Sequence, residues 1–414
     1  MLNIVATCLV ITALMAYVNH RFIRLPTAIG VMAVALVFSL GLVLLNGFGL
    51  VRELHEAEVT LLQSIDFSDV LMQGMLSFLL FAGALHIDLS ELRAYRWQVA
   101  SLAVVATVLS TVLVGVGLWV ALPWVGLSLP LLHCLIFGAL ISPTDPIAVM
   151  GILKSAKAPR ELELVIAGES LFNDGVAVVV FSLLLGMLAS GVTPTLGQGA
   201  ELLAHEAGGG VVLGLVLGYA AYRLLRSIDN YQVEVLLTLA TVSGGYALAH
   251  ALHVSGPLAM VVAGLIVGNH GRAWAMSDTT RRYVDMFWEL VDEILNAVLF
   301  VLIGMEVLLI SFSAADLAGA VLAGVVTLLT RLFTVGLPVH LSPKAFNLPS
   351  GSWKVLTWGG LRGGISVALA LSLPASPERD TVLALTYCVV AFSILAQGLT
   401  IGKVTRKALG APRR

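Results

Sequence analysis

Long apolar runs separated by short polar connections extend over the whole chain of 414 residues. Runs of about 17 to 25 mainly apolar residues are long enough to cross the hydrocarbon core of a bilayer as helices. When the longest runs are divided at Pro, Gly and charge clusters, the pattern predicts thirteen spanning segments. Their approximate ranges are 2–19, 27–46, 67–85, 98–122, 131–153, 162–189, 208–225, 234–251, 255–269, 285–310, 316–339, 354–373 and 381–403. We therefore expect an all-α polytopic membrane protein with about 13 transmembrane helices.

The composition supports this interpretation. Hydrophobic residues make up 58% of the chain and charged residues only 12%, and the mean hydropathy is +0.97. This balance is typical of membrane proteins and not of a water-soluble domain of this size. The net charge of −2 gives no reason to expect a nucleic-acid partner. Because no stretch remains for a soluble domain, we expect neither an enzyme nor a bound cofactor.

Basic residues are distributed unevenly between the two sides that these segments define. If the N-terminus is outside, the inner loops and the C-terminal tail hold nineteen of the 23 Lys and Arg residues. Of the other four, Arg52 and Arg379 fall in outer loops, and Arg331 and Arg362 fall within spans. Because Lys and Arg concentrate in cytoplasmic loops, we expect the N-terminus outside and the C-terminus in the cytoplasm. The short loops and tail are typical of a bacterial inner membrane protein.

Six segments, one linking segment and six further segments give two halves of opposite orientation. Inverted repeats of this kind are common among secondary transporters. On this plan residues 1–403 form one transmembrane unit, with repeat one over 1–190, a linking helix over 208–225 and repeat two over 234–403. Residues 404–414 are then a short basic cytoplasmic tail.

The fifth segment of each half is interrupted. In 131–153, the motif SPTDP places a proline on each side of Thr144 and Asp145, and each proline removes a backbone donor. In 354–373, the motif WGGLRGG places four glycines around Arg362. Unwound backbone is tolerated at membrane depth only where it is buried in protein or lines a cavity. Two broken helices in matching positions therefore predict a binding site near the bilayer midplane.

Five charged residues lie within the predicted spans: Asp145, Glu169, Asp174, Arg331 and Arg362. A charge at the centre of a membrane helix costs about 2.5–3.5 kcal/mol even on the mildest insertion scale. If each arginine neutralises one acid, one carboxylate of the three remains uncompensated. A lone buried carboxylate must bind a proton or a metal cation, so the charge count predicts an ion-binding site.

Asp174 is our candidate for the uncompensated carboxylate, and Glu169 for an ion-paired one. Ser170 and Asp174 are four residues apart and share a helix face, so the two side chains and the carbonyls near Thr144 could form an oxygen cage for Na⁺. A carboxylate that holds either Na⁺ or H⁺ exchanges them by competition, one for one. Asn173 carries no charge, which keeps that cycle electroneutral; the alternative for Ser170 and Asn173 is interhelical hydrogen bonding.

A further group of polar residues lies in the stretch MFWELVDEILN, residues 286–296. Glu289, Asp292, Glu293 and Asn296 recur there at helical spacing. They form either an acidic funnel that steers cations from the cytoplasm or a solvated helix end.

Several motifs resemble those of one family, the monovalent cation/proton antiporters of the bacterial NhaP and animal sodium/proton exchanger branch. In chain order the motifs are SPTDPIAV, GESLFNDGVAVVVF, SGPLAMVVAGLIVGN, FWELVDEILNAVLFVLIGMEV and GGLRGGISVALAL. The resemblance covers nearly the whole chain. It implies a thirteen-helix, NhaA-like inverted-repeat fold with crossing broken helices, a homodimer, and a core domain that moves against a dimerisation domain. It also implies electroneutral exchange of Na⁺ or Li⁺ for H⁺.

By position, Asp174 resembles the ion- and proton-binding aspartate of this family, with Asn173 as its neighbour. Thr144 and Ser170 resemble the other cation ligands, and Asp145 resembles the aspartate of the first broken helix. The resemblance thus implies Na⁺ at Asp174, Ser170 and Thr144.

The resemblance also implies roles for the remaining charges. Glu169 resembles the acid that pairs with an arginine of the eleventh span, here Arg331, and Arg362 matches the arginine of the second broken helix. The chain departs from the family pattern in the third span, where archaeal-type members often have a glutamate and this sequence has Ala82. That departure bears on affinity and on the choice between Na⁺ and K⁺.

Three other functions are compatible with parts of the pattern. A K⁺/H⁺ antiporter would use the same scaffold, because ion preference depends on the size of the oxygen cage. An intramembrane aspartyl protease would also bury two aspartates, here Asp145 and Asp174, but would give no reason for Arg331, Arg362 or the two broken helices. A passive cation channel would need no titratable centre.

Overall fold

The computed structural model describes residues 2–47, 75–156, 158–191, 197, 201–202, 204–306 and 313–409. Within these ranges every regular element is a helix and none is a strand. The prediction of an all-α fold is therefore confirmed.

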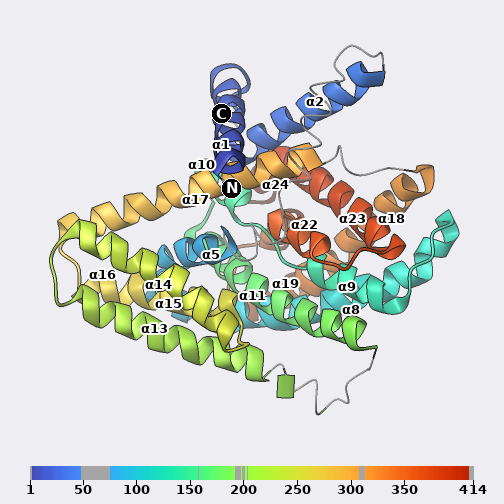
Figure 1. Ribbon diagram of the computed structural model, residues 1–414. Coiled ribbons are helices and arrows are strands. Elements are labelled where there is room, and N and C mark those ends of the chain that lie inside the picture. Colours follow the sequence, from blue (N-terminus) through green and yellow to red (C-terminus); the bar gives the residue numbers. More distant parts are fainter. Residues whose placement is uncertain are drawn as a thin grey trace.

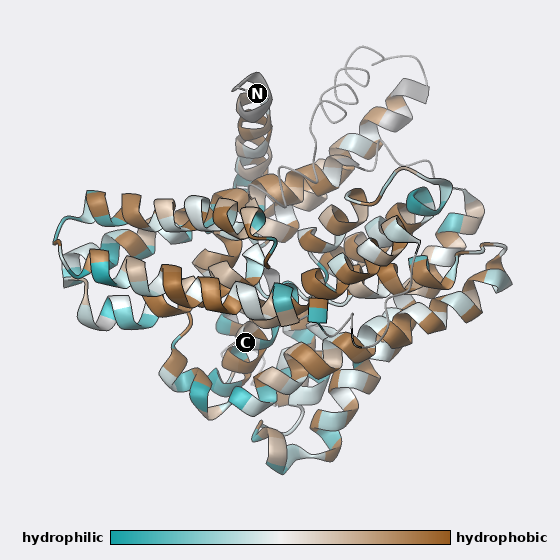
Figure 2. Ribbon diagram, turned by 60° about the horizontal axis from the view of Figure 1, so that its bottom comes forward, coloured by the Kyte–Doolittle hydropathy of each residue, from teal (hydrophilic) through white to brown (hydrophobic). Residues whose placement is uncertain are grey.

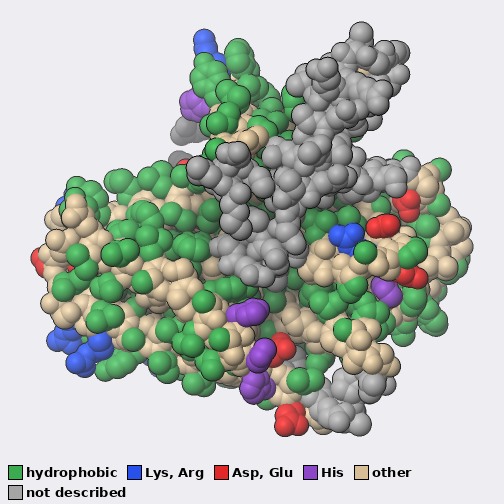
Figure 3. All heavy atoms as spheres, in the orientation of Figure 1, with side chains coloured by type: hydrophobic (Ala, Val, Ile, Leu, Met, Phe, Trp, Pro, Cys, Tyr) green, Lys and Arg blue, Asp and Glu red, His purple; other side chains and the backbone are tan. Residues whose placement is uncertain are grey.

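Many of the helices are long and apolar enough to cross a membrane. Seven such segments are Ala6–Ile23, Arg96–Val125, Arg160–Ser190, Ala204–Leu225, Tyr231–Ala251, Ala314–Leu341 and Pro377–Leu409. Shorter apolar helices cover Thr27–Leu42, Leu76–Leu85, Leu131–Ile141 and Gly256–Gly271. Hydrophobic residues predominate along the helices (Figure 2), and hydrophobic side chains are spread widely over the visible face of the molecule (Figure 3). The protein is a multi-pass membrane protein.

The described helices fall into two groups that lie side by side (Figure 1). The first group contains α2 (Thr27–Gly47), α5 (Leu76–Leu85), α13 (Gly209–Leu225), α14 (Tyr231–Ala251), α15 (Gly256–Ile266) and α17 (Asp278–Glu306). The second contains α8 (Ala106–Ala121), α9 (Leu131–Ile141), α10 (Ile147–Ser155), α11 (Arg160–Ser190), α18 (Ala314–Arg331), α21 (Ser352–Trp358), α22 (Gly364–Leu371) and α23 (Pro377–Phe392). The first described helix of the chain is α1 (Leu2–Val18), and the last is α24 (Gly398–Leu409).

In the described part of the chain, helices overlie the predicted ranges, and most of their bounds differ by a few residues. The two largest extensions are those of α17 and α24. α17 begins at Asp278, seven residues before the predicted start, because a charged amphipathic turn continues the apolar helix outward. α24 extends to Leu409, so the first part of the predicted tail is helical. The predicted start of the third segment, 67–74, the predicted end of the tenth, 307–310, and residues 410–414 lie outside the described residues.

An aromatic core fixes α17 in the first group. The Trp288 side chain is fully buried, and its ring lies 4.8 Å from that of Phe81 on α5. The indole N–H donates to Thr238 Oγ1 of α14 at 3.0 Å. A buried Trp whose polar edge is satisfied contributes a large apolar area at little polar cost. This contact sets which face of α17 turns toward the second group.

The two predicted breaks are present and they touch. α9 ends at Ile141 and α10 begins at Ile147, while α21 ends at Trp358 and α22 begins at Gly364. The extended connections meet where Asp145 N donates to Leu361 O at 2.8 Å. Glycine is required at this crossing, because a Cβ at Gly363 would lie 2.8 Å from Cβ of Asp145.

Candidate functional site: a cavity at the crossing of two broken helices

α11 carries four polar residues across the centre of the molecule. Glu169, Ser170 and Asn173 are 1% exposed and Asp174 is 8% exposed. The helix runs for 31 residues from Arg160 to Ser190. Its backbone N–H groups in this region can therefore all donate to carbonyls of the same helix. The spacing of three and four residues directs these side chains to neighbouring faces of one helix, where each meets a different partner.

Glu169 faces α18 and forms a buried ion pair with Arg331. Arg331 Nη1 donates to Glu169 Oε1, and Nη2 donates to Oε2 at 3.0 Å. Arg331 Nε and Nη2 also donate to the carbonyl of Leu356, at 3.3 and 3.2 Å. A bidentate pair with additional hydrogen bonds is the arrangement in which buried charges are tolerated. Both side chains are therefore fully committed to structure on the far side of α11 from the cavity described below.

Ser170 and Asn173 hold the first break. Asn173 Nδ2 donates to Thr144 Oγ1 at 2.9 Å, and Thr144 N donates to Asn173 Oδ1 at 3.4 Å. The Ser170 hydroxyl donates to the carbonyl of Thr144. These bonds satisfy backbone groups that the interrupted helix cannot pair, which is the requirement for irregular backbone at membrane depth. The interhelical hydrogen bonding considered for both residues is therefore present.

Arg362 holds the same break from the second broken helix. Its Nη1 donates to the carbonyls of Ser142 and Pro143, at 2.6 and 2.9 Å. Its backbone N donates to Ser393 Oγ at 2.9 Å. The residue is 4% exposed. The positive charge thus lies against carbonyl dipoles of the interrupted segment, and that of Ser142 has no helical donor because residue 146 is a proline.

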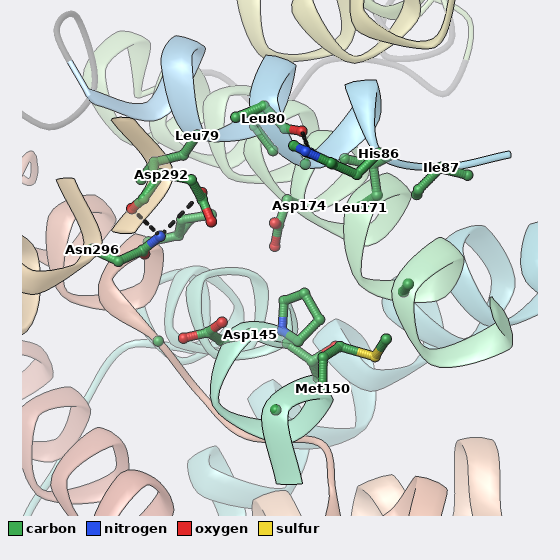
Figure 4. A pocket seen from close by; sticks show the side chains of 18 of the residues that line it. Leu79, Leu80, His86, Ile87, Asp145, Met150, Leu171, Asp174, Asp292 and Asn296 are labelled. Atoms are coloured by element: carbon green, nitrogen blue, oxygen red, sulfur yellow. Dashed lines mark hydrogen bonds between the residues drawn. The ribbon is translucent and has the colours of Figure 1, made fainter. Parts of the chain in front are cut away.

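A cavity of about 620 Å³ lies between the two helix groups and ends at the crossing. Thr144, Asp145 and Asp174 line its inner end, and exposed residues including Lys154 and Glu289 line its rim. Figure 4 shows the carboxyl groups of Asp145 and Asp174 pointing toward one another across the open space. The structure therefore brings three of the predicted site residues to one cavity, whereas Ser170 and Asn173 lie behind Thr144 and not on the lining.

Asp174 differs from the other acids of α11. Its side chain points into the cavity (Figure 4) and is more than nine-tenths buried. Among the residues that the structure describes, no hydrogen bond or ion pair reaches its carboxylate, whereas Glu169 on the same helix has both. A carboxylate so placed is poorly solvated unless it binds a proton or a cation.

The wall opposite α11 is acidic. Asp285, Glu289, Asp292 and Asn296 all line the cavity from one face of α17, while Glu293 does not and is exposed. Intervals of three and four residues place the lining residues on one helix face. Of the two interpretations of this stretch, the one in which its acids face an ion pathway agrees with this placement.

Asp285 is a lining residue that the sequence analysis did not single out. It forms an ion pair with Arg272. Its interval of four residues from Glu289 is the signal that would have identified it.

Ala82, the residue at which the chain departs from the family pattern, lies on the wall of this cavity. Ala82 is fully buried on α5 and lines the cavity wall. Its carbonyl lies 2.8 Å from Nδ1 of His86, which also lines the wall. A longer side chain at position 82 would therefore point toward the cavity, and this chain has none there.

Comparisons with known proteins agree with this geometry. The chain is 56% identical over 413 residues to the Na(+)/H(+) antiporter NhaP of Pseudomonas aeruginosa, covering 98% of this chain and 97% of the relative. It is 37% identical over 362 residues to the Na(+)/H(+) antiporter NhaH of Halobacillus dabanensis, covering 86% of this chain and 87% of the relative.

The fold is similar to that of a solved structure. The sodium proton antiporter MjNhaP1 from Methanocaldococcus jannaschii superposes with a TM-score of 0.75 at 19% identity, covering 98% of this chain and 97% of the other. The sequence model of the family described as "Sodium/hydrogen exchanger, transmembrane" matches residues 9–407. The chain therefore belongs to the sodium/hydrogen exchanger family.

Proposed function

We propose that this protein exchanges Na⁺, or Li⁺, for H⁺ across the membrane, one for one, by competition of the two ions for Asp174. The observation that carries the proposal is the Asp174 carboxylate, buried at the inner end of a cavity without a hydrogen-bond or ion-pair partner among the described residues. Burial disfavours the bare anion, so the group holds a proton or a cation whenever water leaves. The printed names of the Pseudomonas and Halobacillus relatives support sodium and proton as the two ions.

The cation ligands in this proposal are oxygens around the end of the cavity. Na⁺ is a hard cation and binds oxygen ligands, as Ca²⁺ and Mg²⁺ do. Asp174 and Thr144 line the cavity directly, with Asp145 beside them. Ser170 lies one hydrogen bond behind Thr144, and it becomes a ligand when its hydroxyl turns away from the Thr144 carbonyl. Asn173 stays a neutral support of the break and adds no titrating charge to the cycle.

The proposed topology has thirteen membrane crossings in two inverted repeats, with the N-terminus outside and the C-terminus in the cytoplasm. The rim of the cavity carries Lys154 and Arg160, which belong to the loops that the distribution of basic residues assigns to the cytoplasm. The described conformation is then open to the inside. We propose a homodimer in a bacterial inner membrane.

Alternating access follows from the position of the cavity between the two helix groups. A movement of the second group against the first would carry Asp174 from the inner to the outer side. Arg331 joins Glu169 of α11 to the Leu356 carbonyl of the second broken helix, and Asn173 joins α11 to Thr144 of the first. Arg362 joins the two breaks to each other, so the site would move as one body. If the movement occurs only when Asp174 is occupied, each cycle exchanges one ion for the other. The exchange would then couple the sodium gradient to pH homeostasis.

The proposal is tested by pH-gradient dissipation in proteoliposomes that contain an internal pH dye. Na⁺, Li⁺ and K⁺ are added in turn, with and without a clamp on the membrane voltage, and Asp174→Asn serves as the inactive control. We expect Na⁺ and Li⁺ to collapse the gradient independently of the clamp. Collapse by K⁺ alone would identify a potassium antiporter, and a rate that follows the voltage would contradict one-for-one exchange.

A further inference from the structure

Asp292 and Asn296 form a second set of uncommitted oxygens in the cavity. Asn296 Nδ2 donates to the backbone carbonyl of Asp292 at 2.8 Å and to its Oδ1 at 3.1 Å. Both amide hydrogens are therefore used, and in the part of the chain that the structure describes no donor reaches Asn296 Oδ1 or Asp292 Oδ2. Asn296 is 5% exposed and lines the cavity, so its side chain reaches solvent only through the cavity.

These oxygens face the same space as Asp174. Figure 4 shows the Asp292 side chain on one side of the cavity and the Asp145 and Asp174 carboxyl groups across from it. The Lys and Arg side chains that line the cavity in the described ranges, Lys154 and Arg160, are exposed residues of the rim. Arg160 is moreover paired with glutamates, at 3.0 and 3.5 Å.

We propose that Asp292 and Asn296 form a second binding site for a monovalent cation, on the way from the cytoplasm to Asp174. A carboxylate oxygen and an amide oxygen without competing donors are ligands that suit Na⁺, and water in the cavity completes the shell. The inference rests on the proposed function, because it describes how the cation reaches the exchange site. We call this pair of residues the Asp292 site.

The two sites belong to different helix groups. The Asp292 site lies on α17, which packs mainly against α2, α5 and α14, whereas Asp174 lies on α11, which packs mainly against α9 and η3 (Ser101–Val105). Smaller contacts between the groups include those of α11 with α15 and of α17 with α22. The Asp292 site therefore stays in place when Asp174 moves. It raises the local concentration of the cation and transfers the ion to Asp174. It does not add a second transported ion to each cycle. Its loss should weaken the apparent affinity and leave the turnover rate and stoichiometry unchanged.

The test compares Asp292→Asn with Glu293→Gln in the full-length protein reconstituted in proteoliposomes. Asp292→Asn keeps the size of the side chain and an acceptor for Asn296, and removes only the charge. Glu293 is the next residue of α17, is exposed and does not line the cavity, so Glu293→Gln controls for the loss of one charge from the helix. Because a unit charge a few ångströms away in a partly wet cavity changes cation binding substantially, we expect Asp292→Asn to raise the KM for Na⁺ about tenfold. We expect kcat to be unchanged and Glu293→Gln to behave as wild type.

A binding measurement covers the case in which a variant transports poorly. The Na⁺ concentration that gives half of the maximal thermal stabilisation in detergent should rise for Asp292→Asn and for Asn296→Ala, but not for Glu293→Gln. Equal KM values in Asp292→Asn and Glu293→Gln, or a fall in kcat at unchanged KM, would overturn the inference. Failure of the wild-type protein to exchange Na⁺ for H⁺ would instead overturn the proposed function, so the two failures are distinguishable.

Discussion

On α11, the polar residues that surround Asp174 all have partners. Glu169 is bound by Arg331, and Ser170 and Asn173 bind the backbone and side chain of Thr144. These contacts fix the helix and the break next to it, so that the geometry around Asp174 is set before any ion arrives. Preorganised ligands lose less conformational entropy on binding, which would favour the binding of an ion at the proposed site.

Loss of Glu169 tests whether the ion pair is structural. In Glu169→Ala the Arg331 guanidinium remains buried without its counter-charge, and breaking a buried pair in this way typically costs about 3–5 kcal/mol. We expect a clearly lower melting temperature in detergent. The double variant Glu169→Ala with Arg331→Met should recover part of the loss, because it removes the unpaired charge. A melting temperature of Glu169→Ala equal to that of wild type would contradict the structural role.

The residues of α11 could be identified from the sequence, because intervals within one helix determine which side chains share a face. The positions of Ser170 and Asn173 relative to the cavity could not, since they depend on where the unwound segment around Thr144 runs. The same holds for Asp292 and Asn296: helical spacing shows that they share a face, but only the packing of Trp288 against Phe81 decides that this face is the cavity wall.

At the scale of elements, the crossing of the two broken helices is the feature on which the site depends. Each break gives up helical hydrogen bonds and recovers them from the other, as in the bond from Asp145 N to Leu361 O. The prolines and glycines make both interruptions predictable from the sequence. The contact between them is not, because it joins residues more than two hundred positions apart.

Gly363→Ala tests the crossing. The added Cβ would meet the Asp145 side chain at 2.8 Å, closer than real Cβ contacts, so the two connections must separate. We expect the rate of Na⁺/H⁺ exchange to fall at least tenfold, because a misplacement of about 1 Å can cost a hundredfold in rate. Gly151→Ala serves as the control, since a Cβ at Gly151 meets no atom within 4 Å. Equal exchange rates in the two variants would contradict the requirement for close approach.

The short helix α6 (Leu89–Ala94) offers a test of pH dependence outside the membrane segments. Asp88 accepts hydrogen bonds from Ser90 and Glu91 at the start of this helix, and the hydrogen bond from the Ser90 side chain is the main reason that the pKa of Asp88 lies below its ordinary value. A carboxyl with a lowered pKa stabilises the fold above its unfolded pKa and loses this effect as the pH falls through the folded pKa.

We therefore expect amide protection in α6 to be pH-independent near neutrality and to fall below about pH 4. Asp88→Ala should reduce protection by about 1 kcal/mol or less near neutrality, because Asp88 is exposed and water screens its charge. In this variant the additional loss at low pH should be absent. Hydrogen exchange followed by mass spectrometry measures both, and an unchanged pH profile in Asp88→Ala would contradict the role of this carboxyl.

Across the whole molecule, the proposed inward-open conformation requires a cavity that is open on the cytoplasmic side only. Ala167 lines the cavity from α11, and Ser190 lies exposed at the other end of the same helix. After replacement of Cys8, Cys134 and Cys388, Ala167→Cys should react with a membrane-impermeant maleimide in inside-out vesicles only. Ser190→Cys should react in right-side-out vesicles only. The opposite labelling pattern would invert the proposed topology.

The most direct measurement of the central claim is the number of protons released when Na⁺ binds. Calorimetric titration of the purified protein with Na⁺, in buffers of different ionisation enthalpy near the pH at which Asp174 is half protonated, gives this number for each ion bound. Competition at one carboxylate predicts that proton release approaches one per Na⁺ bound at Asp174 as the pH falls, and that Asp174→Asn releases no protons when Na⁺ is added, even if Na⁺ still binds at the Asp292 site. Sodium binding without proton release at every pH, or unchanged release in Asp174→Asn, would contradict the account.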